Sequence, residues 1–341
     1  MRRSSATILF LVISIVGDVH TLSANEGVHL RVNQVGYLAE ETKVAIAFSH
    51  KEVEGTFAVV TVPQGEVVFS GEIAASPAPG WGTFPHYYHL DFSAWKTPGR
   101  YRLRIEDSGE QSRPFTIGKD VYGDYVEDLL RFMCQQRCGY NPVLDMVCHQ
   151  RDGRTAFGPK PADTFVDASG GWHDAGDQLK YLLTGSNATA RMLLAYELEP
   201  NKFDDRSDGL GHPLPNGIPD VLDEARWGLE WIFKLHPSPK ELYHQVADDR
   251  DHKERKMPDH DTSDYGWGPN SYRVVYGADG KPQGLRKFKS ESTGVANLAG
   301  RCAVAMAAAH VVWERDLGDS IFAERCLQAA LEFYAMGKAQ E

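Results

Sequence analysis

The sequence predicts a small all-β sandwich followed by a larger all-α domain. Residues 28–117 alternate polar and apolar side chains with the period of two that strands show, most clearly at 100–105. From residue 119 to the end at 341 the apolar period becomes about 3.6, and helical stretches follow with no strand pattern between them. The chain has 341 residues, which is enough for two domains of ordinary size.

The β domain is expected to contain several short strands. Residues 57–62 and 67–69 are two of them, separated by a Pro-Gln-Gly turn at 63–65. A second turn at 97–99 precedes the strand at 100–105. Several short strands in one small domain are typical of a β-sandwich.

The all-α region is expected to contain five helices. They are residues 121–136, 178–198, 219–235, 293–314 and 320–336. We expect the connections to be loops, and long loops without periodicity often bind ligands or act as lids; they are 139–169, 204–217 and 237–290. Helices joined only by loops fit a toroid of paired helices.

The first 24 residues have the character of a secretory signal peptide. Arg2 and Arg3 supply positive charge, residues 6–16 form an apolar run, and small residues stand near Ser23 and Ala24. The run is too short to cross a bilayer, and we expect no later segment to cross one. The sequence therefore predicts an exported, secreted protein without a membrane anchor.

The charge balance argues against nucleic acid and anionic membranes as partners. The chain has 47 acidic and 36 basic residues, a net charge of −11. A neutral polysaccharide is compatible with this charge. The 7 Trp, 14 Tyr and 15 Phe permit stacking on sugar rings, although aromatic side chains also fill cores.

The stretch 170–177, Gly-Gly-Trp-His-Asp-Ala-Gly-Asp, is the candidate active site. Asp174 and Asp177 stand three apart in a tight turn that we expect to lead directly into the helix at 178–198. A helix N-terminus favours an ionised carboxylate, which suits a general base. On the residues alone, an ordinary helix-capping turn remains the alternative.

These eight residues resemble the G-G-W-x-D-A-G-D signature of glycoside hydrolase family 9, the inverting endoglucanases. Residues 33–37, Asn-Gln-Val-Gly-Tyr, resemble the immunoglobulin-like domain that precedes many catalytic domains of that family, and residues 218–234 resemble the family again. The resemblance implies an immunoglobulin-like sandwich at 28–117. It also implies an (α/α)6 toroid from 119 to 341, of which only about the first half is present.

The resemblance also implies roles for the paired carboxylates. Asp177 would be the general base that deprotonates water, and Asp174 would hold that water. The family's general acid is a Glu in an Asn-Glu context near the end of the domain, and no such motif occurs here; Glu341 is only the last residue. We therefore expect the 341-residue chain by itself to be inactive or nearly so.

Three aromatic residues are candidates for substrate contact. Trp172 belongs to the motif, and Trp267 and Tyr272 lie in the long loop 237–290. For Trp267 and Tyr272 a plain packing role is the equally weighted alternative.

Four residues form a candidate zinc site: Cys138, Cys148, His149 and His173. Two thiolates and two imidazoles suit tetrahedral Zn2+, and four protein ligands leave no open position. On spacing alone, a Cys138–Cys148 disulfide is equally compatible. The resemblance implies a structural zinc held by these four residues. Cys134, a spare cysteine, is expected in the core.

A weaker pattern suggests calcium. Asn216, Asp220 and Asp223 offer oxygen ligands at the start of the helix 219–235, and hard oxygens suit Ca2+. The resemblance implies calcium in this loop, while capping of the helix by Asn216 and Asp220 is the alternative.

The favoured function is inverting hydrolysis of β-1,4-glucan, cellulose-type, by a secreted enzyme. One alternative is an exo-acting hydrolase on cello- or chito-oligosaccharides, with the loop 237–290 closing one end of the groove. Another is a non-catalytic carbohydrate-binding fragment. A zinc-dependent hydrolase is the least favoured, because a closed metal site cannot activate water.

Overall fold

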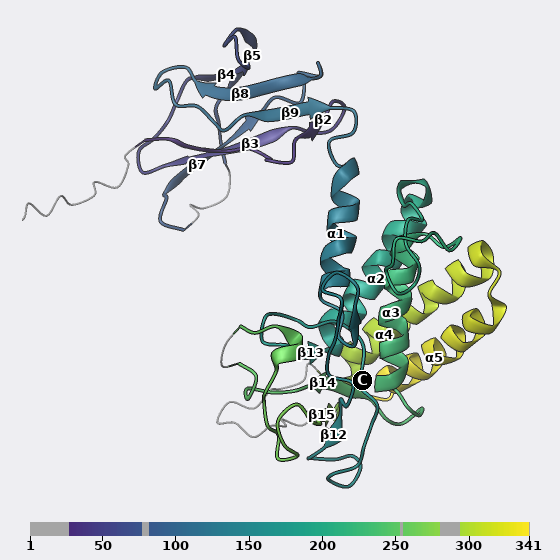
Figure 1. Cartoon of the computed structure of the whole chain (residues 1–341). Coiled ribbons are helices and arrows are strands. Elements are labelled where there is room, and N and C mark those ends of the chain that lie inside the picture. The colour runs from purple at the N-terminus through teal and green to yellow at the C-terminus, as the bar shows by residue number, and fades with distance from the viewer. Residues whose placement is uncertain (1–26, 77–81, 253–254, 280–293, 341) are drawn as a thin grey trace, which may run out of the picture. The chain divides into compact units, whose positions relative to one another are not determined.

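The computed structural model describes residues 27–76, 82–252, 255–279 and 294–340 (Figure 1). The expected signal peptide and Glu341 lie outside these ranges, as do residues 280–290 of the expected loop. The chain divides into two compact units, Met1–Gly123 and Asp124–Glu341, so the boundary falls a few residues beyond the expected one.

The first unit consists of two β-sheets. One sheet has the strand order β2-β9-β8-β4-β5 and the other β1-β3-β7-β6. The strands of the five-stranded sheet are β2 (Tyr37–Leu38), β4 (Thr56–Thr61), β5 (Val67–Glu72), β8 (Gly99–Ile105) and β9 (Phe115–Gly118). Those of the four-stranded sheet are β1 (His29–Arg31), β3 (Val44–Ser49), β6 (Ala74–Ala75) and β7 (His86–Asp91). The expected all-β first domain is therefore confirmed.

The alternating pattern of β8 explains how the two sheets pack against each other. Tyr101, Leu103 and Ile105 are buried, while the arginines between them are not. Leu103 lies opposite Val59 of β4 and shares one core with Leu90 of the other sheet. Leu103 is fully buried, so its truncation to alanine is expected to cost about 2–5 kcal/mol.

The second unit contains the five expected helices. They are α1 (Gly123–Gln135), α2 (Leu182–Leu198), α3 (Asp220–Leu235), α4 (Val295–Val312) and α5 (Ser320–Lys338). Short helical turns, η1 (Pro200–Lys202), η2 (Pro258–His260) and η3 (Trp313–Leu317, a π-helical turn), complete the helical structure. The expected bounds agree within three residues except at the start of α2.

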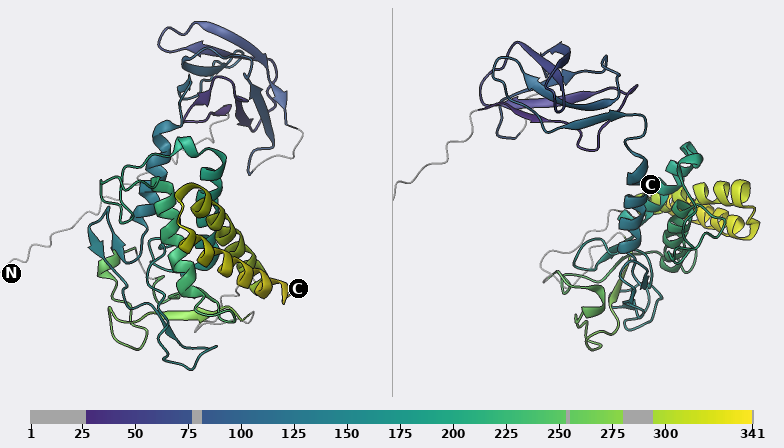
Figure 2. Two further views of the ribbon diagram at one scale, coloured as in Figure 1. Left: turned by 90° about the vertical axis from the view of Figure 1, so that its right-hand side faces the viewer. Right: turned by 45° about the horizontal axis from the view of Figure 1, so that its top comes forward.

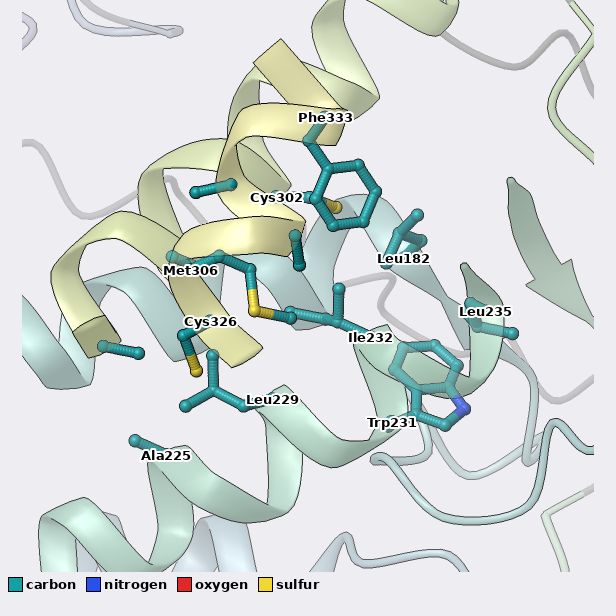
Figure 3. Packing of buried hydrophobic residues seen from close by; sticks show 14 of the residues in the cluster. Leu182, Ala225, Leu229, Trp231, Ile232, Leu235, Cys302, Met306, Cys326 and Phe333 are labelled. Carbon is teal, nitrogen blue, oxygen red and sulfur yellow. The ribbon is translucent and has the colours of Figure 1, made fainter. Parts of the chain in front are cut away.

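The helices pack through one hydrophobic core. α4 and α5 lie side by side in all views (Figures 1 and 2). Leu229 and Ile232 of α3 meet Met306 of α4 and Cys326 of α5, and all four side chains are fully buried (Figure 3). Leu182 at the start of α2 belongs to the same core.

Short strands also occur in the second unit, and the expectation that none would was wrong. β10 (Tyr140–Asn141) pairs with β11 (Met146–Val147). A four-stranded sheet has the order β12-β15-β14-β13; its strands are β12 (Arg154–Thr155), β13 (Lys180–Tyr181), β14 (Tyr243–Val246) and β15 (Val274–Gly277). β14 and β15 are buried at every residue, so they lack the alternation by which a half-buried strand is recognised.

α2 begins four residues later than expected. Lys180 and Tyr181 pair with Val246 and Gln245 of β14, so this segment is extended and the helix starts at Leu182. The turn that carries Asp177 therefore leads into a strand of the small sheet and not directly into a helix.

Two apolar helical segments of the second unit stand out. On α1 the stripe of Tyr125, Leu129 and Phe132 is 44%, 67% and 56% exposed. The stretch Val295–Leu317 is long and apolar enough to cross a membrane by length and composition, which the sequence analysis did not expect. Of the 18 most apolar consecutive residues in this stretch, 44% are buried within the unit. The core helix of a globular domain can be equally long and apolar.

Candidate active site and metal cluster

The motif 170–177 forms a compact turn stabilised by its own backbone. The amide of Asp174 donates to the carbonyl of Leu179 at 2.7 Å, and the amide of Gln178 donates to that of Ala175 at 3.2 Å. Gly171 has a φ of +71°, and a Cβ there would collide with the indole of Trp231. Only glycine fits, because it tolerates this conformation and leaves room for the ring.

Both carboxylates of the turn reach solvent. Asp174 is exposed, and its Oδ1 accepts a hydrogen bond from the hydroxyl of Thr184 at 2.9 Å. The side chain of Asp177 is 23% exposed, and its Oδ2 lies 2.6 Å from Nε2 of His252. Neither residue caps α2, whose first turn has no side-chain cap. The capping alternative and the helix-dipole argument therefore both fail.

His252 is a candidate site residue that the sequence did not predict. It lies in the segment after β14, and its Nδ1 forms a second ion pair with Asp249. The sequence does not reveal its position, because that position depends on the pairing of β14 with β13, in which Lys180 lies opposite Val246. That register brings the residues after Val246 beside those before Lys180, so His252 lies against Asp177.

The segment that carries His252 is held by its own ion pairs. Asp248 accepts hydrogen bonds from the guanidinium of Arg250 at 2.9 and 2.6 Å and from the hydroxyl of Tyr276 at 2.6 Å. Tyr265 donates to Oδ2 of Asp251 at 2.9 Å. These contacts fix the backbone on both sides of Asp249 and so define where His252 can reach.

A buried ion network anchors the backbone next to Asp177. Arg273 donates to both oxygens of Asp152 at 2.8 and 2.7 Å and to the carbonyl of Gln178 at 2.9 Å. Lys180 lies 2.8 Å from the same carboxylate. Burial alone would raise the pKa of Asp152, but Arg273 and Lys180 outweigh it and hold the pKa below its usual value. A charged network therefore braces the carbonyl that follows the candidate base.

The four predicted metal ligands converge. One ligand atom from each of Cys138, Cys148, His149 and His173 lies within 4.8 Å of the others. Nε2 of His173 lies 3.3 Å from Nδ1 of His149 and 3.8 Å from the sulfur of Cys148. All five cysteines of the chain are free thiols, so the disulfide alternative is not what the structure shows.

The surroundings of the cluster also fit a metal. Nε2 of His149 hydrogen-bonds Oδ2 of Asp261 at 2.9 Å, which leaves Nδ1 facing the cluster. Lys180 donates to the sulfur of Cys138 at 3.3 Å. Burial opposes ionisation of the Cys138 thiol, but the hydrogen bond from Cys148 and the charge of Lys180 outweigh it and lower its pKa well below the usual value. The hydrogen bond to Cys138 and burial raise the pKa of the Cys148 thiol, so Cys138 is the one of the two that is poised to supply a thiolate.

The cluster lies directly behind the candidate active site. His173 is a predicted ligand and the neighbour of Asp174, and its amide donates to the carbonyl of Gln136 at 2.8 Å. The amide of Cys138 donates to the carbonyl of Gly171 at 2.9 Å. The cluster and the catalytic turn are thus joined by the backbone.

Trp172 occupies the core, so the expectation that it contacts substrate does not agree with the structure. It is 6% exposed, and its indole N–H donates to Glu224 at 2.7 Å. Glu224 also accepts hydrogen bonds from Arg137 at 2.8 Å and from the thiol of Cys134 at 2.7 Å. A ring that stacks on a sugar must expose at least one face to solvent, and this ring is packed against Gly228. Cys134 is half-buried, with its thiol turned to Glu224.

Trp267 and Tyr272 form part of a half-exposed aromatic surface. Their ring centroids are 6.5 Å apart, and the guanidinium of Arg154 lies 4.0 Å from the centroid of the Tyr272 ring. The indole N–H of Trp267 donates to Asp163 at 2.7 Å. Tyr272 directly precedes Arg273, so this surface is connected to the catalytic turn through one residue.

The calcium candidates lie together at the start of α3. The amide group of Asn216 donates to Asp223 at 2.9 Å, and Asp220 accepts from the amides of Arg206 and Ser207 at 3.1 and 2.9 Å. α3 has no side-chain cap, so the capping alternative is not observed. Burial raises the pKa of Asp223 to about 6.

Similar solved structures identify the class of protein. A metagenome-derived glycoside hydrolase family 9 endoglucanase superposes with a TM-score of 0.66 at 29% identity, covering 92% of this chain and 55% of that one. A zinc-binding triple mutant of the family 9 endoglucanase J30 gives 0.63 at 29% identity, covering 87% and 52%. The second unit therefore has the fold of part of a helical glycoside hydrolase domain.

Sequence comparison gives the family. The model of glycosyl hydrolase family 9 matches residues 122–341, and that of the cellulase N-terminal ig-like domain matches residues 25–110. The chain belongs to glycosyl hydrolase family 9, with an immunoglobulin-like domain before the helical region. The (α/α)6 class that the sequence resemblance implied is confirmed.

Named relatives include several glucan hydrolases. Endoglucanase C of Cellulomonas fimi is 33% identical over 65% of this chain and 23% of its own length. A xyloglucan-specific endo-β-1,4-glucanase of Bacteroides ovatus is 29% identical over 64% and 38%. A cellulose 1,4-β-cellobiosidase of Acetivibrio thermocellus is 27% identical over 88% and 35%. The chain thus spans well under half the length of these relatives.

Proposed function

We propose that the protein containing this chain is a secreted enzyme that hydrolyses β-1,4-glucan with inversion of the anomeric configuration. The observation that carries the proposal is the pair Asp174 and Asp177 on one solvent-reachable turn, with His252 on Asp177. Membership of family 9 and the endoglucanase names of relatives support the substrate class.

In this mechanism Asp177 is the general base. It takes a proton from a water molecule while the water oxygen attacks the anomeric carbon. His252 hydrogen-bonds Oδ2 of Asp177, which directs the other oxygen towards the water. Asp174, held by Thr184, positions the same water. The general acid stands on the opposite face of the sugar, about 6.5–9.5 Å from the base in inverting enzymes, and the family resemblance assigns it to a glutamate further along the domain.

The proposal is tested on the gene product that contains these residues, with cellohexaose as substrate. Proton NMR at early times distinguishes the anomers of the new reducing end. An inverting enzyme releases the α-anomer first, because a single displacement at the anomeric carbon of a β-linkage inverts its configuration. Release of the β-anomer first, or no cleavage of any β-1,4-glucan, would contradict the proposal.

We propose that Cys138, Cys148, His149 and His173 bind a structural Zn2+. Two thiolates and two imidazoles fill a tetrahedral site, so the ion would brace the turn and would not activate water. Its charge would allow both thiols to ionise. Metal analysis of purified protein should give one zinc per chain, and a variant with Cys148→Ser should give less than half of that.

We also propose calcium binding by Asn216, Asp220 and Asp223. Burial raises the pKa of the Asp223 carboxyl to about 6 and so disfavours its charged form, which a bound cation would stabilise. Titration with Ca2+ followed by calorimetry tests this, and an Asp223→Asn variant should bind no calcium.

Substrate contact is proposed for Trp267 and Tyr272, because their half-exposed rings are connected to the turn through Arg273. A second candidate function, exo-action on cello-oligosaccharides, is favoured by the cellobiosidase relative, whose similarity extends over 88% of this chain. Product profiles on polymer and on short oligomers separate the two. Trp172 is not proposed for this role, because its side chain is buried.

A further inference from the structure

His252 lies between two carboxylates. Its Nε2 contacts Oδ2 of Asp177 at 2.6 Å, and its Nδ1 contacts Oδ1 of Asp249, three residues earlier in the chain. The side chains of Asp249, His252 and Asp177 are 35%, 38% and 23% exposed. The three groups therefore form a continuous chain that ends at the proposed base.

Asp249 lies between two acidic residues that hold the loop in place. Asp248 is bound to Arg250 and Tyr276, and Asp251 is bound to Tyr265 and Arg273. These four contacts build the loop. The carboxylate of Asp249 faces the imidazole of His252.

The hydrogen bond at one ring nitrogen of a histidine decides what the other nitrogen can do. With Asp249 at Nδ1, the ring cannot turn over without losing that contact, and Nε2 must face Asp177. Without Asp249, the ring is held on one side only and can rotate about its own axis. The orientation of His252, and through it that of the Asp177 carboxylate, depends on Asp249.

We propose that Asp249 is a positioning residue for the base Asp177 and acts through His252. The inference rests on the proposed function, in which Asp177 deprotonates water. Asp249 fixes the imidazole, the imidazole fixes Oδ2 of Asp177, and Oδ1 is thereby presented to the water. Asp249 itself touches neither the water nor the sugar.

The first test is structural and uses the 341-residue chain. Nitrogen-15 NMR of labelled histidine reports the hydrogen bonding of both ring nitrogens, and a His252→Gln variant assigns the signals. Asp249→Asn should shift both His252 signals, and Asp249→Glu should restore them at least in part. The matched control is Asp259→Asn, because Asp259 also lies beside a histidine, His260, at 3.7 Å in the same loop region. Unchanged His252 signals in Asp249→Asn would overturn the inference.

The second test is kinetic and uses the gene product that contains the chain. Asp249→Asn should lower kcat about 10- to 100-fold, the usual effect of removing an outer partner of an active-site group, with KM nearly unchanged. The melting temperature should also be unchanged, because partly exposed ion pairs contribute little to stability.

The outcomes separate the two proposals. If Asp177→Asn abolishes hydrolysis and Asp249→Asn leaves kcat at the parental value, the role of Asp249 is refuted and the proposed function stands. If Asp177→Asn leaves hydrolysis unchanged, the proposed function is refuted and the role of Asp249 with it.

Discussion

The substitution Arg273→Met should strongly destabilise the second unit. The side chain is similar in length, but the guanidinium is lost. Asp152, which is fully buried, then keeps Lys180 as its charged partner, and the carbonyl of Gln178 loses a donor. Removing one partner of a buried ion pair costs about 3–5 kcal/mol, because the other charge stays buried without compensation.

The magnitude translates into a large shift in melting temperature. For a domain of 150–250 residues, 1 kcal/mol corresponds to about 2–4 °C, so Arg273→Met should lower the Tm by about 6–20 °C. Thermal unfolding followed by circular dichroism measures this. Arg315→Met is the matched control, because Arg315 pairs with Glu197 and Asp316 on the surface and should change the Tm very little. If both variants lost the same amount, the buried network would not anchor the turn as argued.

Three further predictions concern the metals and the aromatic residues. A strong chelator should lower the Tm by about 5 °C or more before hydrolysis is lost, because the cluster supports the turn from behind; immediate loss of activity at an unchanged Tm would indicate a catalytic metal. The folded chain binds the proton of Asp223 more tightly than the unfolded chain, since its pKa is about 6 against 3.8, so stability should fall as pH rises from about 4 to 6, by at most about 3 kcal/mol. Asp223→Asn should therefore be more stable than the parent at pH 7 without calcium and equal to it below pH 4, and equal Tm values at pH 7 would contradict this. Trp172→Phe should lower the Tm and leave the affinity for cellohexaose unchanged, whereas Trp267→Ala should lower the affinity and leave the Tm unchanged. Calorimetry measures both quantities. A loss of affinity in Trp172→Phe would indicate that Trp172 contacts the substrate.

Much of the architecture was predictable because the determining patterns are local. The alternation in β8 and the helical spacing in α3 and α5 are visible in a short window of sequence, and both domains were recognised from them. The four metal candidates were predicted from the family resemblance, since their spacing alone left a Cys138–Cys148 disulfide equally compatible. The structure brings all four together.

The rest depended on pairing between distant segments. The start of α2 moved because Lys180 and Tyr181 pair with β14, more than sixty residues later in the chain. The same pairing brings His252 to Asp177, and no periodicity in the sequence announces it. Trp172 was misassigned because an aromatic residue in a motif looks the same whether its ring faces solvent or, as here, Glu224 in the core.

The central claim is that the carboxylate of Asp177 is the base in glucan hydrolysis. The most direct measurement is the rate of cellohexaose cleavage by Asp177→Asn in the gene product that contains this chain, beside Asp167→Asn as a control. Asp167 pairs with Lys234 at 3.3 Å and lies ten residues from Asp177 in the chain. We expect Asp177→Asn to be slower by about 10²- to 10⁴-fold, the usual contribution of general base catalysis, at an unchanged Tm, and Asp167→Asn to keep the parental rate. Cleavage by Asp177→Asn at the parental rate would contradict the claim.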